Sequence, residues 1–245
     1  MTVTRKVAFI TGANRGLGLE TARGLGQLGI EVVLGVRNAE RAEEAIAALR
    51  ADGITASAIA FDAKKPATYE NAYDHLAHHY GQLDILVNNA GVALEDLFAP
   101  NASSVTPAVL RETFDVNFFA VVELTQLLLP LIRLSPEGRI VNLSSILGSL
   151  TLQSDPKSPI AAAKAFAYNA SKTALNAFTV HLADELRATP IKVNSAHPGW
   201  VKTDMGGENA PIEVSEGGRT SVLLATLPAD GPTGTFTHVG ETLPW

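Results

Sequence analysis

A tyrosine and a lysine stand four positions apart in the second half of the chain, at Tyr168 and Lys172. On a helix, this spacing places the phenol and the ammonium group on one face. A free phenol has a pKa of about 10 and is a poor proton donor or acceptor at neutral pH. A nearby ammonium group lowers that pKa, so the pair favours proton transfer to or from a substrate oxygen.

A serine at the end of a candidate strand could complete this chemistry. Ser145 directly follows the strand expected over residues 139–144, and its hydroxyl could hydrogen-bond a substrate carbonyl oxygen. Less specific interpretations stay open at this point. A Tyr-x-x-x-Lys spacing also occurs by chance on surface helices, Ser144 and Ser145 could both be turn residues, and Tyr168 could be a core aromatic side chain.

A glycine-rich segment near the start of the chain predicts a nucleotide site. Residues 11–18 read Thr-Gly-Ala-Asn-Arg-Gly-Leu-Gly, with a candidate strand before them and a helical pattern from Gly16. Gly12 permits a tight turn, Gly16 lets the backbone approach a pyrophosphate, and Gly18 lets the helix pack against the strand. The free amides at the start of the helix would then face the anion. The alternative is an ordinary strand-to-helix turn that contains glycines.

The residues after the next two strands indicate which dinucleotide binds. A site for NAD usually has an acidic residue at the end of the second strand, but Val36 stands there and Arg37 follows. Arg37 and Arg15, which lies in the glycine loop, suit the 2′-phosphate of NADP(H). If Arg37 is only a solvated charge, NAD remains open. Asp62, after the third strand, could accept from the adenine amino group or cap a helix.

The hydrophobic pattern predicts a scaffold that brings these strand ends together. Short β-branched runs alternate with helical patterns, which is typical of βαβ units and a parallel sheet buried on both faces. Right-handed crossovers then give an α/β fold, a single doubly wound Rossmann-like domain over residues 1–245. Strands are expected at residues 7–11, 31–36, 56–61, 83–88, 139–144, 191–196 and 234–238.

Three segments interrupt this alternation. Thr106 and Pro107 form a good N-cap and first turn for a long helix at about 107–134, with Asn117 in its middle. An insertion covers about residues 149–166, and a glycine-rich loop at about 200–212 is a candidate substrate lid. Loops that follow the carboxyl ends of strands are where open α/β sheets bind ligands.

Composition excludes several classes of protein. The 245 residues carry a formal net charge of −6, so no positive field favours nucleic acid or anionic lipid. There is no cysteine, which excludes disulfides and thiolate metal sites. The histidines at 75, 78 and 79 are interpreted as a solvated helix face, so no metal site is expected. We find no apolar run long enough to span a membrane and expect a cytoplasmic protein.

Several short motifs follow one another along the chain. They are residues 11–18, Asn88-Asn89-Ala90-Gly91, Asn117, Ser145, Tyr168 with Lys172, and Pro198-Gly199 with Thr203. This set resembles the short-chain dehydrogenase/reductase family over nearly the whole chain. The segments 197–205 and 240–245, together with the insertion, resemble its carbonyl-reductase-like branch.

The resemblance implies a seven-stranded Rossmann-like sheet and a Ser-Tyr-Lys-Asn tetrad. Tyr168 would be the acid/base, Ser145 would orient the carbonyl, and Ser145 is preferred to Ser144 because it stands three residues before a glycine, Gly148. Lys172 would hold the nicotinamide ribose and lower the Tyr168 pKa, and Asn117 would anchor a water between Lys172 and solvent. Asn89 and Val201 would line the nicotinamide ribose and carboxamide, and Thr203 would bond the carboxamide. The full expected cofactor set is Gly12, Asn14, Arg15, Gly16, Leu17, Gly18, Arg37, Asp62, Asn89, Ala90, Gly91, Tyr168, Lys172, Pro198, Gly199, Val201 and Thr203.

One departure from the family pattern bears on assembly. The serine-to-tyrosine interval in the family is commonly about a dozen residues, whereas here it runs from 145 to 168. The tyrosine helix forms a dimer interface in many members, and an insertion before it could block that face. Both a homodimer and a monomer therefore stay open.

These observations predict NADPH-dependent reduction of aldehydes or ketones to alcohols, reversible as alcohol oxidation. The insertion and the candidate lid are apolar with few charges, so a small hydrophobic carbonyl or alcohol substrate is expected. Two alternatives stay open. One is an NAD-dependent secondary-alcohol dehydrogenase, and the other is a non-catalytic regulatory protein that senses a dinucleotide.

Overall fold

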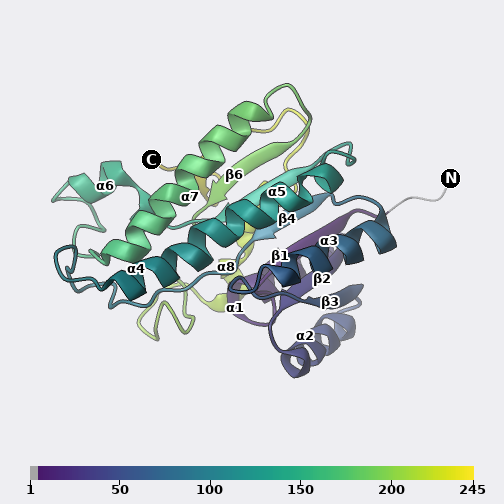
Figure 1. The fold of residues 1–245 in the computed structure, drawn as a ribbon, viewed down its shortest axis with the longest axis horizontal. Helices are drawn as coiled ribbons and strands as arrows, with labels where there is room; N and C mark the ends of the chain where they lie inside the picture. The colour runs from purple at the N-terminus through teal and green to yellow at the C-terminus, as the bar shows by residue number, and fades with distance from the viewer. Residues whose placement is uncertain (1–4) are drawn as a thin grey trace.

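A twisted sheet forms the centre of the protein, and helices cover both of its faces (Figure 1). The computed structural model describes residues 5–245, and in that part of the chain the sheet has eight strands in the order β3-β2-β1-β4-β5-β6-β7-β8. The strands are β1 Val7–Thr11, β2 Glu31–Val36, β3 Ala56–Ala60, β4 Ile85–Asn88, β5 Arg139–Leu143, β6 Lys192–Ala196, β7 Phe236–His238 and β8 Glu241–Thr242.

Alternation along the buried strands divides the core into two layers. Ala8 and Ile10 face one side of the sheet, whereas Val7 and Phe9 face the other. The first layer packs against α1 Gly16–Gln27, α2 Ala39–Ala51 and α9 Arg219–Ala225. The second packs against α3 Ala67–Tyr80, α5 Ala120–Ile132 and α7 Phe166–Glu185, which cross the front of the sheet in Figure 1. The doubly wound α/β fold predicted from the sequence is confirmed.

The strand count differs by one from the prediction of seven. Each predicted strand is present, and β1 to β7 pair in parallel, but β8 adds an antiparallel edge of two residues. A two-residue turn makes this hairpin, because Val239 and Gly240 have φ values of 47° and 89°. The Val239 amide donates to Thr220 Oγ1 at 3.0 Å, which holds the unusual backbone. A non-glycine residue at positive φ gives little sequence signal.

The long helical region begins at the predicted cap. The Thr106 hydroxyl accepts from the Val109 amide at 3.3 Å, and α4 Pro107–Phe114 leads through a π-helical turn, η1 Asp115–Phe119, into α5. The expectation that no apolar run could span a membrane was wrong for this region, since Pro107–Ile132 is long and apolar enough by length and composition. Half of its most apolar window is buried inside the fold, as in the core helix of a globular domain.

Topology places the site at one edge of the sheet. The chain winds from β1 outward to β2 and β3, and then returns to place β4 on the other side of β1. Open α/β sheets bind ligands at the carboxyl ends of the strands where the winding reverses. The connections that follow the carboxyl ends of β5 and β6 contain short helices: η2 Ile146–Gly148 and α6 Leu150–Ser154 after β5, and α8 Val214–Gly217 after β6.

Candidate active site

One cavity of about 850 Å³ opens at this edge of the sheet. Its size lies within the usual range for cofactor and small-molecule sites. Every residue predicted from the sequence to bind the cofactor lines it, and so does Ser145. Asn117 is the one predicted site residue that does not line it.

The glycine loop has the geometry that a pyrophosphate requires. Gly12 and Gly16 have φ values of 66° and 57°, which favour glycine. A Cβ at Gly18 would lie 2.6 Å from both Asn89 Nδ2 and the Gly12 carbonyl oxygen, so no side chain fits there. Arg15 stands at the N-cap of α1 and, within the described chain, its side chain makes no capping hydrogen bond, and the first residues of the helix, Gly16 to Gly18, line the cavity. These features fit the diphosphate of a dinucleotide.

Asn89 holds the glycine loop from the neighbouring strand end. Its side-chain amide donates to the carbonyl oxygens of Thr11 and Gly12 at 2.7 and 3.2 Å. In return, the Thr11 hydroxyl accepts from the backbone amides of Asn89 and Ala90, both at 3.0 Å. Asn89 lines the cavity, but its amide is directed at the loop. The carboxyl ends of β1 and β4 are therefore fixed to each other by hydrogen bonds.

The rim of the cavity carries the residues expected near the adenosine end of the cofactor. Arg37 is exposed on this rim, and Arg15 forms an ion pair with Asp204 of the candidate lid. Asp62 Oδ1 accepts from the Lys64 amide at 3.0 Å, which forms a local turn. Helix α3 begins at Ala67, so the helix-cap alternative for Asp62 was wrong.

Tyr168 and Ser145 lie together at the inner end of the cavity. Tyr168 projects from the first turn of α7 and is 7% exposed, and Ser145 follows β5 and is 8% exposed. Burial raises the pKa of the Tyr168 phenol to about 12, and a hydrogen bond with Ser145 partly opposes this increase. The phenol is therefore neutral throughout the physiological pH range.

This result corrects the sequence-based expectation for the pKa. Lys172 was expected to lower the pKa of the Tyr168 phenol, but its Nζ lies 5.8 Å from the centre of the ring and donates to the Leu143 carbonyl oxygen at 2.8 Å. Burial lowers the pKa of Lys172 itself to about 8. Removal from water opposes the charged form of both groups, and it is the largest cause of both pKa shifts.

The two candidate serines point in different directions. Ser145 Oγ caps η2 by accepting from the Leu147 amide at 3.2 Å and reaches the Tyr168 phenol. Ser144 Oγ is directed at the Lys172 carbonyl oxygen, 3.5 Å away. The structure thus brings together Ser145 and Tyr168, and directs Ser144 at the backbone of α7.

Asn117 lies behind the cavity wall at the π-helical turn. It is fully buried, and its side chain pairs with both backbone groups of Val92 at 2.8 Å and donates to Ser171 Oγ at 3.1 Å. A Cβ on Gly91 would lie 3.3 Å from Asn117 Oδ1 and 3.6 Å from Lys172 Nζ, so the two side chains flank this glycine. A π-helical turn also interrupts the regular backbone hydrogen bonding, which is common at functional sites.

The lid and the insertion form the other walls. Val201 and Ile212 pair at the base of the lid, and Trp200 Nε1 donates to the Gly206 carbonyl oxygen at 2.8 Å. In the insertion, Gln153 Nε2 donates to the carbonyl oxygens of Leu147 and Ala163 at 3.3 and 3.1 Å. Both loops are therefore closed by their own hydrogen bonds.

His197 supports the catalytic turn. Its Nδ1 accepts from the Ile146 amide at 3.3 Å, next to Ser145. Burial, with a smaller contribution from His238, lowers the pKa of His197 to about 3, so the ring is neutral and can accept. This contact gives His197 a structural role at the end of β6.

Comparison with known proteins identifies the family. Residues 6–213 match the short chain dehydrogenase family. The chain belongs to this family. It is 32% identical over 283 aligned positions to carbonyl reductase [NADPH] 1 of Mus musculus, covering all of both chains. The NADPH-bound carbonyl reductase from chicken fatty liver has a TM-score of 0.85 at 27% identity, with 99% of this chain and 100% of that chain covered. Salutaridine reductase from Papaver somniferum has a TM-score of 0.81 at 29% identity, with 95% and 99% covered. The predicted family and its carbonyl-reductase-like branch are confirmed.

One wall of this short-chain dehydrogenase site could not be predicted from the sequence. Leu97 and Phe98 line the cavity from a segment, residues 92–105, that joins β4 to α4. The Phe98 ring lies 6.2 Å from that of Trp200, so this segment meets the lid. The segment has no repeated spacing or motif, and only its position after a strand could have indicated a role.

Proposed function

We propose that this short-chain dehydrogenase reduces aldehydes or ketones to alcohols with NADPH. The observation that carries the proposal is the buried, neutral Tyr168 phenol, hydrogen-bonded to Ser145 in the cavity that the glycine loop also lines. Two of the relatives described above, the carbonyl reductases of Mus musculus and of chicken fatty liver, are named with NADPH, in agreement with the cofactor predicted from Arg15 and Arg37. The proposed active unit is the whole chain as one domain, acting in the cytoplasm.

The chemistry divides between the cofactor and the protein. When bound, NADPH supplies the hydride that adds to the carbonyl carbon. Ser145 orients the carbonyl oxygen by donating a hydrogen bond, and Tyr168 donates its phenolic proton to that oxygen as negative charge develops. Lys172 holds the ribose of the cofactor, and Asn117 anchors the water that connects Lys172 to solvent.

The pKa of Tyr168 favours the reductive direction. Reduction needs a protonated phenol, and a pKa of about 12 keeps the proton in place at neutral pH. Proton transfer to an alkoxide is still downhill, because an alkoxide is a stronger base than a phenolate. Alcohol oxidation needs the phenolate, which burial disfavours.

The walls of the cavity favour a hydrophobic substrate. Apolar side chains from three separate loops surround the space beyond Ser145 and Tyr168: Leu97, Phe98, Leu147, Ile160, Trp200 and Met205. Apolar pockets of this kind bind by burying surface, and a few polar groups fix the orientation. We therefore propose aromatic or aliphatic carbonyl compounds without a phosphate group as substrates.

Two variants test the proposal in one assay. Loss of reduced-nicotinamide absorbance is followed with a panel of aldehydes and ketones, in parallel with NADPH and NADH. We expect NADPH-dependent turnover, and in Tyr168→Phe a decrease of about a thousandfold in kcat with unchanged NADPH binding. Tyr80→Phe is the matched control, because the Tyr80 hydroxyl donates to Glu31 Oε1 on the far side of the fold from this cavity.

Other outcomes would separate the alternatives. Turnover at the wild-type rate in Tyr168→Phe would contradict the assignment of the proton donor. Faster turnover with NADH would favour the NAD-dependent dehydrogenase. Thermal stabilisation by NADPH with no turnover of any compound would favour a dinucleotide sensor.

A further inference from the structure

The helix that carries Tyr168 begins without a cap of its own. The first amides of an α-helix have no partner within the helix. The first backbone bond within α7 runs from the Asn169 amide to the Ala165 carbonyl oxygen at 3.0 Å, which leaves the amides of Phe166, Ala167 and Tyr168 to find other partners. Ala165 stands at the N-cap position, and its methyl group cannot accept a hydrogen bond.

The missing cap comes from the segment 92–105, about seventy residues earlier. Glu95 accepts from the Ala167 amide through Oε1 at 3.2 Å and from the Tyr168 amide through Oε2 at 2.9 Å. Asn101 Oδ1 accepts from the Phe166 amide at 2.9 Å, and its Nδ2 donates to Glu95 Oε1 at 2.6 Å. The two side chains together satisfy all three free amides.

We propose that Glu95 is a positioning residue for Tyr168, holding the backbone of the proton donor through a cap supplied by a different loop. This inference rests on the proposed function, because it assumes that Tyr168 transfers the proton. A carboxylate is also the preferred charge at a helix N-terminus. Because the two carboxylate oxygens of Glu95 accept from two different amides, they restrain the first turn of α7 more than a single hydrogen bond would.

The same segment is also held at its other end. Val92 pairs with the Asn117 side chain through both of its backbone groups at 2.8 Å. The segment therefore connects the π-helical turn at Asn117 with the first turn of α7. Between these two attachments, Leu97 and Phe98 line the cavity. Positioning of Tyr168 and the shape of the substrate wall thus depend on one segment.

Two substitutions of Glu95 test its role in the full chain. In Glu95→Ala we expect kcat to fall about tenfold to a hundredfold, the range expected for misplacement of a reacting group by about 1 Å. NADPH binding should not change, and the solvent deuterium isotope effect on kcat should increase, because proton transfer becomes slower. Glu95→Gln keeps an oxygen acceptor and should recover most of the lost kcat.

Asp96→Ala is the matched control. Asp96 carries the same charge on the same loop, but its Oδ1 accepts from the Phe98 amide at 3.0 Å within that loop. Because Phe98 lines the cavity, we expect Asp96→Ala to raise KM for the carbonyl compound but to keep the wild-type kcat and isotope effect. Equal losses of kcat in Glu95→Ala and Asp96→Ala would overturn the proposal. A Glu95→Ala protein that melts at a lower temperature but keeps its kcat and isotope effect would also overturn it. Tyr168→Phe separates the two possible failures when Glu95→Ala is fully active. If Tyr168→Phe is fully active as well, the proposed function itself fails, whereas if Tyr168→Phe is inactive, only the role of Glu95 fails.

Discussion

The two halves of the cavity are built in different ways. The cofactor half consists of strand ends and the glycine loop, and it is shaped by the backbone: glycines at positive φ, a helix start and the Asn89 contact. The substrate half consists of the segment 92–105, the insertion and the lid. These three loops are held by side chains that bond to backbone groups: Glu95 reaches the start of α7, whereas Gln153 and Trp200 close their own loops.

This difference determines how each half responds to substitution. At Gly18, in the cofactor half, the neighbouring backbone leaves no room for a side chain, so a single added carbon there can remove the site. In the substrate half several hydrogen bonds share the work, and each contributes about 1 kcal/mol. We therefore expect large, all-or-none effects in the first half and graded effects in the second.

The largest effect is expected for Gly18→Ala. The new Cβ would lie 2.6 Å from the Gly12 carbonyl oxygen and 2.8 Å from Ala13 Cα, both of them backbone atoms. We expect NADPH binding to be lost, as measured by fluorescence titration. Gly29→Ala is the control, since Gly29 lies in the turn that follows α1 and has open space around it. At its φ of 80°, alanine should cost about 1 kcal/mol of stability and leave NADPH binding unchanged. Tight NADPH binding by Gly18→Ala would show that the loop can adjust.

The next effect concerns Lys172, where the two halves meet. Burial lowers its pKa from 10.5 to about 8, so between these values the unfolded state binds more protons than the folded state. The free energy of unfolding should therefore rise from pH 8 toward pH 10.5, by at most about 3 kcal/mol. Tyr168 acts in the opposite sense. Its pKa is raised from 10.0 to about 12, so its contribution to the free energy of unfolding is lost as the pH rises from 10 to 12.

Denaturant unfolding at several pH values measures this effect. Lys172→Met removes the titrating group while keeping a long apolar stem, and the rise above pH 8 should disappear in this variant. The other titrating groups are common to both proteins, so they cancel in the difference. An identical pH dependence in the wild type and in Lys172→Met would contradict the assignment.

A smaller effect is expected at Arg37, on the rim of the cofactor half. Arg15 is already paired with Asp204, so Arg37 is the clearer test of recognition of the 2′-phosphate. Loss of a charged hydrogen bond costs about 1.5–3 kcal/mol, and Arg37→Asp should weaken NADPH binding by about ten- to a hundredfold while improving use of NADH. Comparison of kcat/KM for the two cofactors measures the change. An unaltered ratio would remove Arg37 from the account of cofactor choice.

The same contrast explains what the sequence could predict. The strands, the glycine loop and the order of the motifs depend on local spacing, and the fold and the family predicted from them are confirmed. Local spacing left Ser144 and Ser145 both open, and only the family resemblance favoured Ser145. In the structure Ser145 lies beside Tyr168, and Ser144 is directed at the backbone of α7. The predicted direction of the Tyr168 pKa shift was wrong, because the spacing of the two residues indicates their distance but not the burial of both groups.

Contacts between distant loops left no pattern in the sequence. Glu95 looks like one more surface carboxylate until the fold brings it to the start of α7. The extra strand β8 depends on a positive φ at Val239, which residue type does not favour. The insertion was predicted to lie beside the site, but the bonds that close it could not be predicted from its composition.

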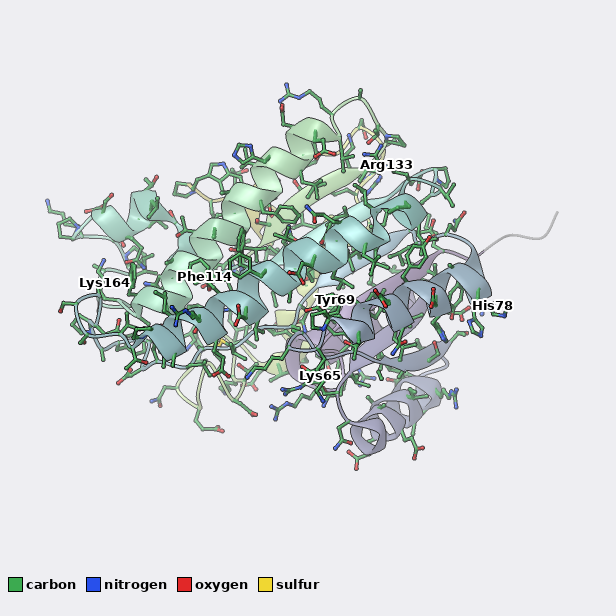
Figure 2. All side chains as sticks on the ribbon, in the orientation of Figure 1. Lys65, Tyr69, His78, Phe114, Arg133 and Lys164 are labelled. Atoms are coloured by element: carbon green, nitrogen blue, oxygen red, sulfur yellow. The ribbon has the colours of Figure 1, made fainter. Side chains whose placement is uncertain are left out.

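The smallest effect is expected for the side-chain hydrogen bonds that close the insertion. Gln153 joins Leu147 to Ala163, and Lys164 Nζ donates to the Gln153 carbonyl oxygen and to Oε1, both at 2.7 Å. Lys164 lies at the end of the molecule that carries α4 and α6 (Figure 2). Because Leu147 and Ala163 both line the cavity, Gln153→Ala should loosen the substrate wall and raise KM for the carbonyl compound by about three- to tenfold. The values of kcat and the NADPH dissociation constant should stay within about twofold of the wild type, because the cofactor half does not depend on these side-chain bonds.

Gln126→Ala, on the exposed face of α5, is the matched control and should change neither KM nor the NADPH dissociation constant. If Gln153→Ala instead weakens NADPH binding as much as it raises KM, the two halves of the cavity are coupled, and the contrast between a rigid cofactor half and an adjustable substrate half is wrong.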